Sequence, residues 1–148
     1  MIGGGSTDMK RLLALGLILF IFIVACGKSE VRKPTPDSLQ TVEAFAVVEN
    51  LRTAYVKNDR DLLEKNTTKL GYVNIAGGRK NFDSVEMTFN PALVEIYGDM
   101  LHVYVSWNGV WKRGDNTIED RGLAVLIMKE KPLKLDDVLR ASPFNKPE

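Results

Sequence analysis

The stretch Ile-Glu-Asp-Arg-Gly-Leu-Ala-Val-Leu-Ile-Met-Lys, residues 118–129, decides the fold. Its second half, Leu123–Met128, is apolar at every position, so an extended strand would carry apolar side chains on both faces. A strand of this kind belongs in the interior of a sheet, with helices on one face and another surface on the other. The stretch therefore predicts a central strand, and the rest of the chain must supply its neighbours and its cover.

Short runs with a period of two, separated by turn residues, flank this strand on both sides. The expected strands are residues 72–75, 85–89, 93–97, 101–107 and, at an edge, 133–139. The expected turns are Gly77-Gly78, Asn90-Pro91, Gly98-Asp99, residues 112–116 and Lys131-Pro132. Phe144 is expected to pack on the sheet. The second half of the chain is therefore predicted to be a bent, mostly antiparallel sheet.

Helical signals precede the strands. Thr35 or Ser38 can cap a helix that contains a stripe of apolar residues at steps of three and four, namely Ala44, Val47, Val48, Leu51, Ala54 and Tyr55. Asn58-Asp59 then breaks and recaps the chain for a short second helix, residues 60–65, and Gly71 is expected to end it or the turn that follows. Helices followed by strands predict an α+β domain over residues 38–148, with the N-terminal helices packed on a curved sheet.

The N-terminus has the order of a secretory signal. Lys10 and Arg11 precede an uncharged run of 14 residues, 12–25, which is shorter than the roughly 18 to 20 residues of a membrane-spanning helix. Met9 makes a more ordinary start than Met1, because the polar residues 1–8 have no place in such a signal. The run predicts export from the cytoplasm.

The residues at the C-terminal end of this apolar run resemble a known processing signal. Ile23-Val24-Ala25-Cys26 resembles the lipobox of bacterial lipoproteins, in which the cysteine becomes the first residue of the mature chain. The resemblance implies removal of residues 1–25, a thioether-linked diacylglycerol on Cys26 and an acyl chain, typically palmitate, on its freed amine. An uncleaved anchor or a plain secretory peptide is the alternative. Gly27 after the cysteine favours the outer membrane, facing the periplasm, in a Gram-negative source.

Residues 26–37 are predicted to be the lipidated cysteine followed by a flexible tether. The tether is predicted because these residues are polar, contain proline and lack an apolar period. Loss of Lys10, Arg11 and Asp8 with the signal leaves 18 basic and 18 acidic residues of the original 20 and 19. This balance argues against nucleic acid as a partner. The single cysteine also excludes an internal disulfide.

The order of the predicted elements resembles a known superfamily. Ala54-Tyr55, Asn58-Asp59, the segment 107–111 with a tryptophan at each end, Arg121-Gly122 and Ser142-Pro143-Phe144 resemble the nuclear transport factor 2-like, or SnoaL-like, cone fold. The resemblance covers residues 38–144 and looks most like the small lipoproteins of that superfamily. It implies a cavity between helices and sheet, and in many members a dimer formed through the sheet face.

Two groups of residues are candidates for function. Tyr55, Tyr97, Trp107 and Trp111 could line a cavity for a small apolar ligand, although aromatic residues also fill ordinary cores. His102, Tyr104 and Ser106 share the outer face of the strand 101–107, where they could form an interface for a homodimer. His102 is the chain's only histidine, and one imidazole without partners makes neither a metal site nor a triad.

The sequence therefore predicts a lipid-anchored binding module of the cell envelope, for a small molecule or a protein, without a cofactor or metal. The first alternative is an envelope enzyme of isomerase or dehydratase type, for which Asp61, Asp99 and Asp120 qualify by residue type alone. The second alternative is a structural protein that uses its sheet face on a partner.

Cys26→Ala tests the anchor. The variant should lose the mass of its lipid and should move from the detergent phase to the aqueous phase, because buried acyl chains supply the attachment. Mass spectrometry and detergent partitioning measure this. An unchanged mass and unchanged partitioning would contradict lipidation.

Overall fold

The computed structural model describes residues 33–78, 82–129 and 131–145. The chain divides into two units, residues 1–33 and 34–148, and the description below concerns the second unit. The predicted signal, with its lipobox residues Ile23, Val24, Ala25 and Cys26, lies outside the described residues.

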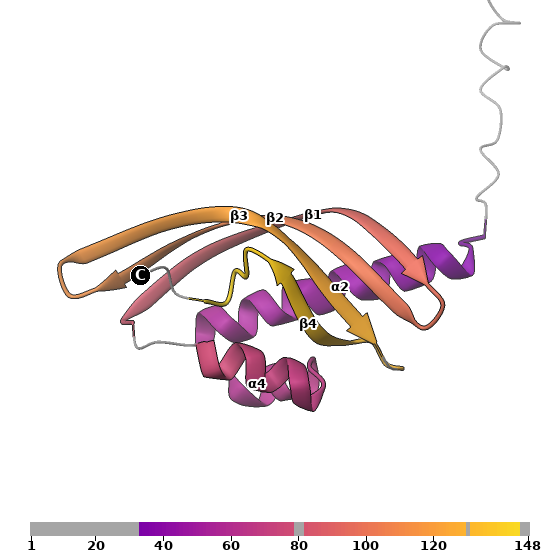
Figure 1. Ribbon diagram of the computed structural model, residues 1–148, viewed down its shortest axis with the longest axis horizontal. Coiled ribbons are helices and arrows are strands. Elements are labelled where there is room, and N and C mark those ends of the chain that lie inside the picture. Colours follow the sequence, from indigo (N-terminus) through magenta and orange to yellow (C-terminus); the bar gives the residue numbers. More distant parts are fainter. Residues whose placement is uncertain (1–32, 79–81, 130, 146–148) are drawn as a thin grey trace, which may run out of the picture. The chain divides into compact units, whose positions relative to one another are not determined.

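The described domain consists of helices followed by strands (Figure 1). In chain order these are α2 (Pro36–Lys57), α3 (Arg60–Lys65), α4 (Lys69–Gly78), β1 (Ser84–Tyr97), β2 (Met100–Arg113), β3 (Asn116–Lys129) and β4 (Lys134–Arg140). The strands form one antiparallel sheet in the order β1-β2-β3-β4, which curves over α2. The predicted α+β class is confirmed, with β3 in the interior of the sheet and β4 at an edge.

Local signals define the first helices as the sequence predicts. Thr35 caps α2, its hydroxyl accepting a hydrogen bond from the Ser38 amide at 3.2 Å. Asn58 ends α2 in the left-handed conformation, at φ 57°. The Asp59 carboxylate then accepts from the Leu62 amide at 2.9 Å and starts α3. The predicted apolar stripe of α2 is buried from Ala44 to Tyr55.

The core lies between α2 and the concave face of the sheet. The residues of β2 alternate, and its inward side chains are Leu101, Val103, Val105, Trp107 and Trp111. Two glycines make room for the indoles, since a Cβ on Gly109 would overlap the Trp111 ring and one on Gly122 would crowd Trp107 and Ala141. Phe144, fully buried, closes the core against Tyr55 and Phe89.

The expected strand at 72–75 is wrong, because these residues belong to α4. A run of four residues is too short to distinguish the period of two of a strand from the period of 3.6 of a helix. Tyr72 and Ile75, three positions apart, are also neighbours on a helix. Tertiary contact decides between them. Gly71 lacks a Cβ, so α4 approaches the backbone of β4 at Leu135, and Ile75 is buried with an exposed fraction of 1%. Gly71 therefore lies within a helix that it does not end.

The break predicted at Asn90-Pro91 is also wrong. β1 runs from Ser84 to Tyr97 without interruption, and its pairing with β2 shifts between Pro91 and Leu93. Ala92 is the extra residue of this bulge. The proline is tolerated because β1 is an edge strand, where a missing amide hydrogen costs no ladder bond. The loop expected at residues 112–116 narrows to a tight turn in which Gly114 has a φ of 56°.

Gly71→Ala should lower the free energy of unfolding by about 1 to 3 kcal/mol, because the new methyl group would overlap the carbonyl oxygen of Leu135. Gly77→Ala is the matched control in the same helix. A Cβ there meets nothing within 4 Å, so the control should be about 0.5 to 1 kcal/mol more stable than the parent. Urea unfolding followed by circular dichroism measures both, and equal midpoints for the two variants would contradict the packing of α4 on β4.

Candidate functional site

Three of the four predicted cavity residues lie in the core. Tyr55, Trp107 and Trp111 have exposed fractions of 1%, 4% and 1%. The two indoles meet edge to face, with ring centroids 6.3 Å apart. Trp107 donates its ring N–H to the carbonyl of Ala141 at 2.9 Å, and Trp111 donates to the Tyr55 hydroxyl at 3.4 Å. These side chains fill the space between the helices and the sheet.

The buried polar side chains of the described residues are Asn66 and Thr67. Thr67 donates to the carbonyl of Leu63 at 2.8 Å, and Asn66 donates to that of Leu62 at 2.7 Å. They hold the link between α3 and α4. The candidate acids Asp61, Asp99 and Asp120 are all exposed. A carboxylate poised in an interior cavity, as isomerase chemistry needs, is thus not found among the described side chains.

Tyr97, the fourth predicted cavity residue, lies on the opposite face of the sheet and is 50% exposed. The bulge is the physical reason. Before Ala92 the inward residues of β1 are odd-numbered, as Val85 opposite Trp111 shows, and after it they are even-numbered, as Val94 opposite Val103 shows. A strand of period two that gains one residue exchanges its faces. Tyr97 is therefore turned outward.

The same exchange creates a cluster of polar and aromatic side chains on the outer face. Glu95 lies opposite His102 across the β1–β2 pair. Its carboxylate accepts a hydrogen bond from the Tyr97 hydroxyl at 2.9 Å and another from the Tyr104 hydroxyl at 2.7 Å. The rings of Tyr97 and His102 lie with centroids 4.6 Å apart. One carboxylate thus holds two phenols in place, and an imidazole packs beside them.

The electrostatics of the cluster follow from these bonds. The hydrogen bond from Tyr104, and then that from Tyr97, lowers the pKa of the Glu95 carboxyl. The pKa of each tyrosine is raised, mainly because its hydroxyl donates to Glu95. The arrangement stabilises an ionised carboxylate beside two protonated phenols.

Apolar side chains surround the cluster on the outer face. Leu93, Leu123 and Leu139 are 50%, 60% and 46% exposed. The register places Leu93 opposite Tyr104, and Leu123 opposite Ser106. His102, Tyr104 and Ser106 therefore share this face, as predicted. We call the set Leu93, Glu95, Tyr97, His102, Tyr104, Ser106, Leu123 and Leu139 the outer patch.

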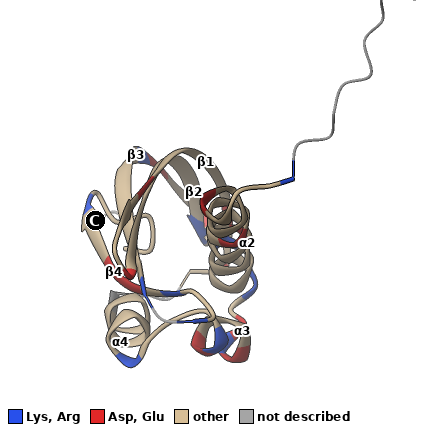
Figure 2. Cartoon of the chain, turned by 90° about the vertical axis from the view of Figure 1, so that its right-hand side faces the viewer, with Lys and Arg blue, Asp and Glu red and all other residues tan. Residues whose placement is uncertain are grey.

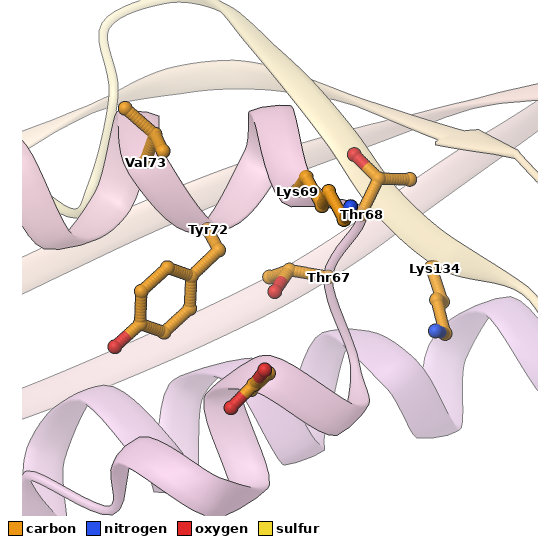
Figure 3. Close-up of a pocket in the computed structure, with 7 residues that line it drawn as sticks. Thr67, Thr68, Lys69, Tyr72, Val73 and Lys134 are labelled. Carbon is orange, nitrogen blue, oxygen red and sulfur yellow. The ribbon is translucent and has the colours of Figure 1, made fainter.

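Among the open depressions of the described surface, two lie beside aromatic side chains and away from the outer patch. One, of about 540 Å³, lies between α3, α4 and the start of β4, where Tyr72, Thr67 and Lys134 line it (Figure 3). This depression could not be predicted from the sequence, because the pattern of residues 72–75 indicates a strand, whereas Tyr72 lies on α4. The other, of about 520 Å³, lies beside Trp111, with Phe82 and Arg113 in its lining.

Metal-ligand groups, membrane-spanning helices and the distribution of charge each bear on the kind of site that the described part of the chain can hold. It has no group of three or more His, Cys, Asp or Glu side chains placed to hold a metal ion. Within residues 33–78, 82–129 and 131–145, no helix is long and apolar enough to cross a membrane. In the view of Figure 2, acidic and basic segments alternate along the helices and strands.

Comparison with known proteins identifies the fold. No family model matches the chain, and no curated protein does so either. A solved structure does match, that of a nuclear transport factor 2-like superfamily protein from Salmonella enterica subsp. enterica serovar Typhimurium str. LT2. The two chains are 16% identical, the match covers 72% of this chain and 93% of the other, and the TM-score is 0.63. The domain has the nuclear transport factor 2-like cone fold, with the sheet left open.

Glu95→Gln should lower the pKa of Tyr97 and Tyr104 toward the ordinary phenol value of about 10, because it removes the hydrogen bonds to a charged carboxylate and the negative charge that opposes their ionisation. Tyrosine absorbance during an alkaline titration measures the shift. Glu119→Gln is the control, because Glu119 is an exposed acidic residue on the same outer face of the sheet, on β3. This change should leave the tyrosine titration curve unchanged.

The same variant tests acid stability. Because the pKa of Glu95 is lower in the folded chain, its stabilising contribution is present above the unfolded value of about 4 and is lost as the pH falls through the folded value. The parent should therefore lose more free energy of unfolding between pH 6 and pH 3 than Glu95→Gln does. Identical losses would contradict the hydrogen-bonded cluster.

Proposed function

We propose that this chain is a lipid-anchored module of the cell envelope that binds protein through its outer patch, and that a second copy of the chain is its partner. The observation that carries the proposal is the exposure of Leu93, Tyr97, Leu123 and Leu139, each about half exposed on one face of the sheet. Large apolar side chains gathered on one face are typical of interaction sites.

The outer patch has the composition of an interface. Tyrosines are favoured in protein contacts because they bury a large rigid ring and keep a hydroxyl for hydrogen bonding. Here Tyr97 and Tyr104 are already fixed by Glu95, so less side-chain entropy would be lost on binding. The leucines around them supply apolar area.

A second copy suits this surface because it carries both signs of charge. Glu95 is an acidic residue of the patch, and Arg140, which lies close enough to influence Tyr104, is a basic residue beside the patch. In a two-fold dimer the same patch meets itself, so each sign must find the other on one surface. Among the described helices, none lies over this face of the sheet, and α2 lies on the concave side (Figure 1).

The anchor is the second part of the proposal. Lipid on Cys26 would hold the domain at a membrane through the tether of residues 26–37, and the outer membrane facing the periplasm is the proposed location in a Gram-negative cell. The charge order of the signal and the lipobox support it.

The filled core supports binding over catalysis. The enzyme alternative needs a cavity with a carboxylate and a hydroxyl, whereas Tyr55, Trp107 and Trp111 occupy that space. A small-molecule ligand stays a prediction, for which the two open depressions provide candidate places.

A photo-activated cross-linker placed at Leu123 in living cells should yield a product with the mass of two chains, because Leu123 is 60% exposed within the outer patch. Placement at Leu70 is the matched control, since this residue is 54% exposed but lies on α4. Leu93→Asp should reduce the Leu123 product at least about fivefold, because burying a carboxylate in an apolar contact is unfavourable. An equal dimer yield from Leu70, or a Leu123 product containing only a different protein, would contradict the proposal.

A further inference from the structure

α2 carries a second apolar stripe, which the core does not use. Leu39 and Val42 are 56% and 67% exposed, and they are three positions apart, so they lie on one face of the helix. The buried stripe that begins at Ala44 faces the sheet. Packing within the domain therefore does not account for two large apolar side chains in the first turns of α2.

This stripe lies at the end of the domain where the chain enters. The first turns of α2 project at the same end as the β1–β2 turn (Figure 1). The side chain of Glu43 accepts a hydrogen bond from the Leu133 amide at 3.0 Å, which ties this part of α2 to the segment between β3 and β4.

We propose that Leu39 and Val42 dock on the surface of the bilayer that holds the lipid of Cys26. The inference rests on the lipid anchor of the proposed function and adds an orientation to it. Thr35, the cap of α2, is nine positions after Cys26 in the chain, so the lipid lies within about 30 Å of the helix start even when the tether is fully extended. The first turns of α2 are the described part of the domain that is nearest to such an anchor along the chain.

A lipid surface fits this stripe better than a protein does. A specific protein interface buries roughly 1,000 Å² or more, and two partly exposed side chains provide far less. A bilayer needs no matching shape, and amphipathic helices bind it with the apolar face inserted near the headgroups. The short tether raises the effective concentration of the surface, so even a weak contact is populated.

The test uses the full chain, processed in cells and reconstituted in vesicles of phosphatidylethanolamine and phosphatidylglycerol. Val42→Cys is labelled with an environment-sensitive fluorophore, and the thioether leaves Cys26 unreactive, so one label is taken up. Nitroxide lipids should quench this label at least about twofold more than a label at Val73→Cys. Val73 is the matched control, because it is 63% exposed but lies on α4 and not on the first turns of α2.

Leu39→Ser in the Val42→Cys chain should bring the quenching down toward the control while flotation with the vesicles is unchanged, because the anchor remains. Equal quenching at the two labels in a protein that floats would overturn the docking and leave the anchor standing. A protein that does not float and takes up a second label at Cys26 would overturn the anchor itself, and the docking with it.

Discussion

The burial of two indoles between α2 and the sheet is the interaction on which the rest of the domain depends. Trp107 and Trp111 come from the same face of β2, and each covers a glycine of the sheet, Gly122 and Gly109. A buried aromatic side chain of this size contributes about 3 kcal/mol or more. Their ring N–H groups are satisfied, which makes the burial favourable. The strands and helices are arranged around these two rings.

Because side chains fill the core, the functional sites of this domain are expected at its surface. One fold can carry a ligand cavity, an active site or a binding surface in different proteins, so the fold alone does not identify an activity. Here the interior is occupied by Tyr55, Trp107, Trp111 and Phe144. Apolar side chains that remain exposed include those on the outer face of the sheet and those on the first turns of α2. Both places suit contacts between an anchored domain and its surroundings.

One residue decides what the outer face contains. The bulge at Ala92 exchanges the faces of β1, so that Leu93, Glu95 and Tyr97 point away from the core. Without it, these three side chains would face the helices, where the Glu95 charge would be costly to bury. The bulge also brings Glu95 opposite His102 and within hydrogen-bond reach of Tyr104. The candidate interface is therefore a consequence of register.

The sequence by itself determined the features that depend on a few neighbouring residues. The caps at Thr35 and Asp59, the buried stripe of α2, the interior position of β3 and the outward side of His102, Tyr104 and Ser106 could all be predicted. The helical state of residues 72–75 and the face of Tyr97 could not. The first depends on the contact of Gly71 with the β4 backbone, and the second on a register shift against β2. Both are set by segments far away in the chain, and a local period carries no information about them.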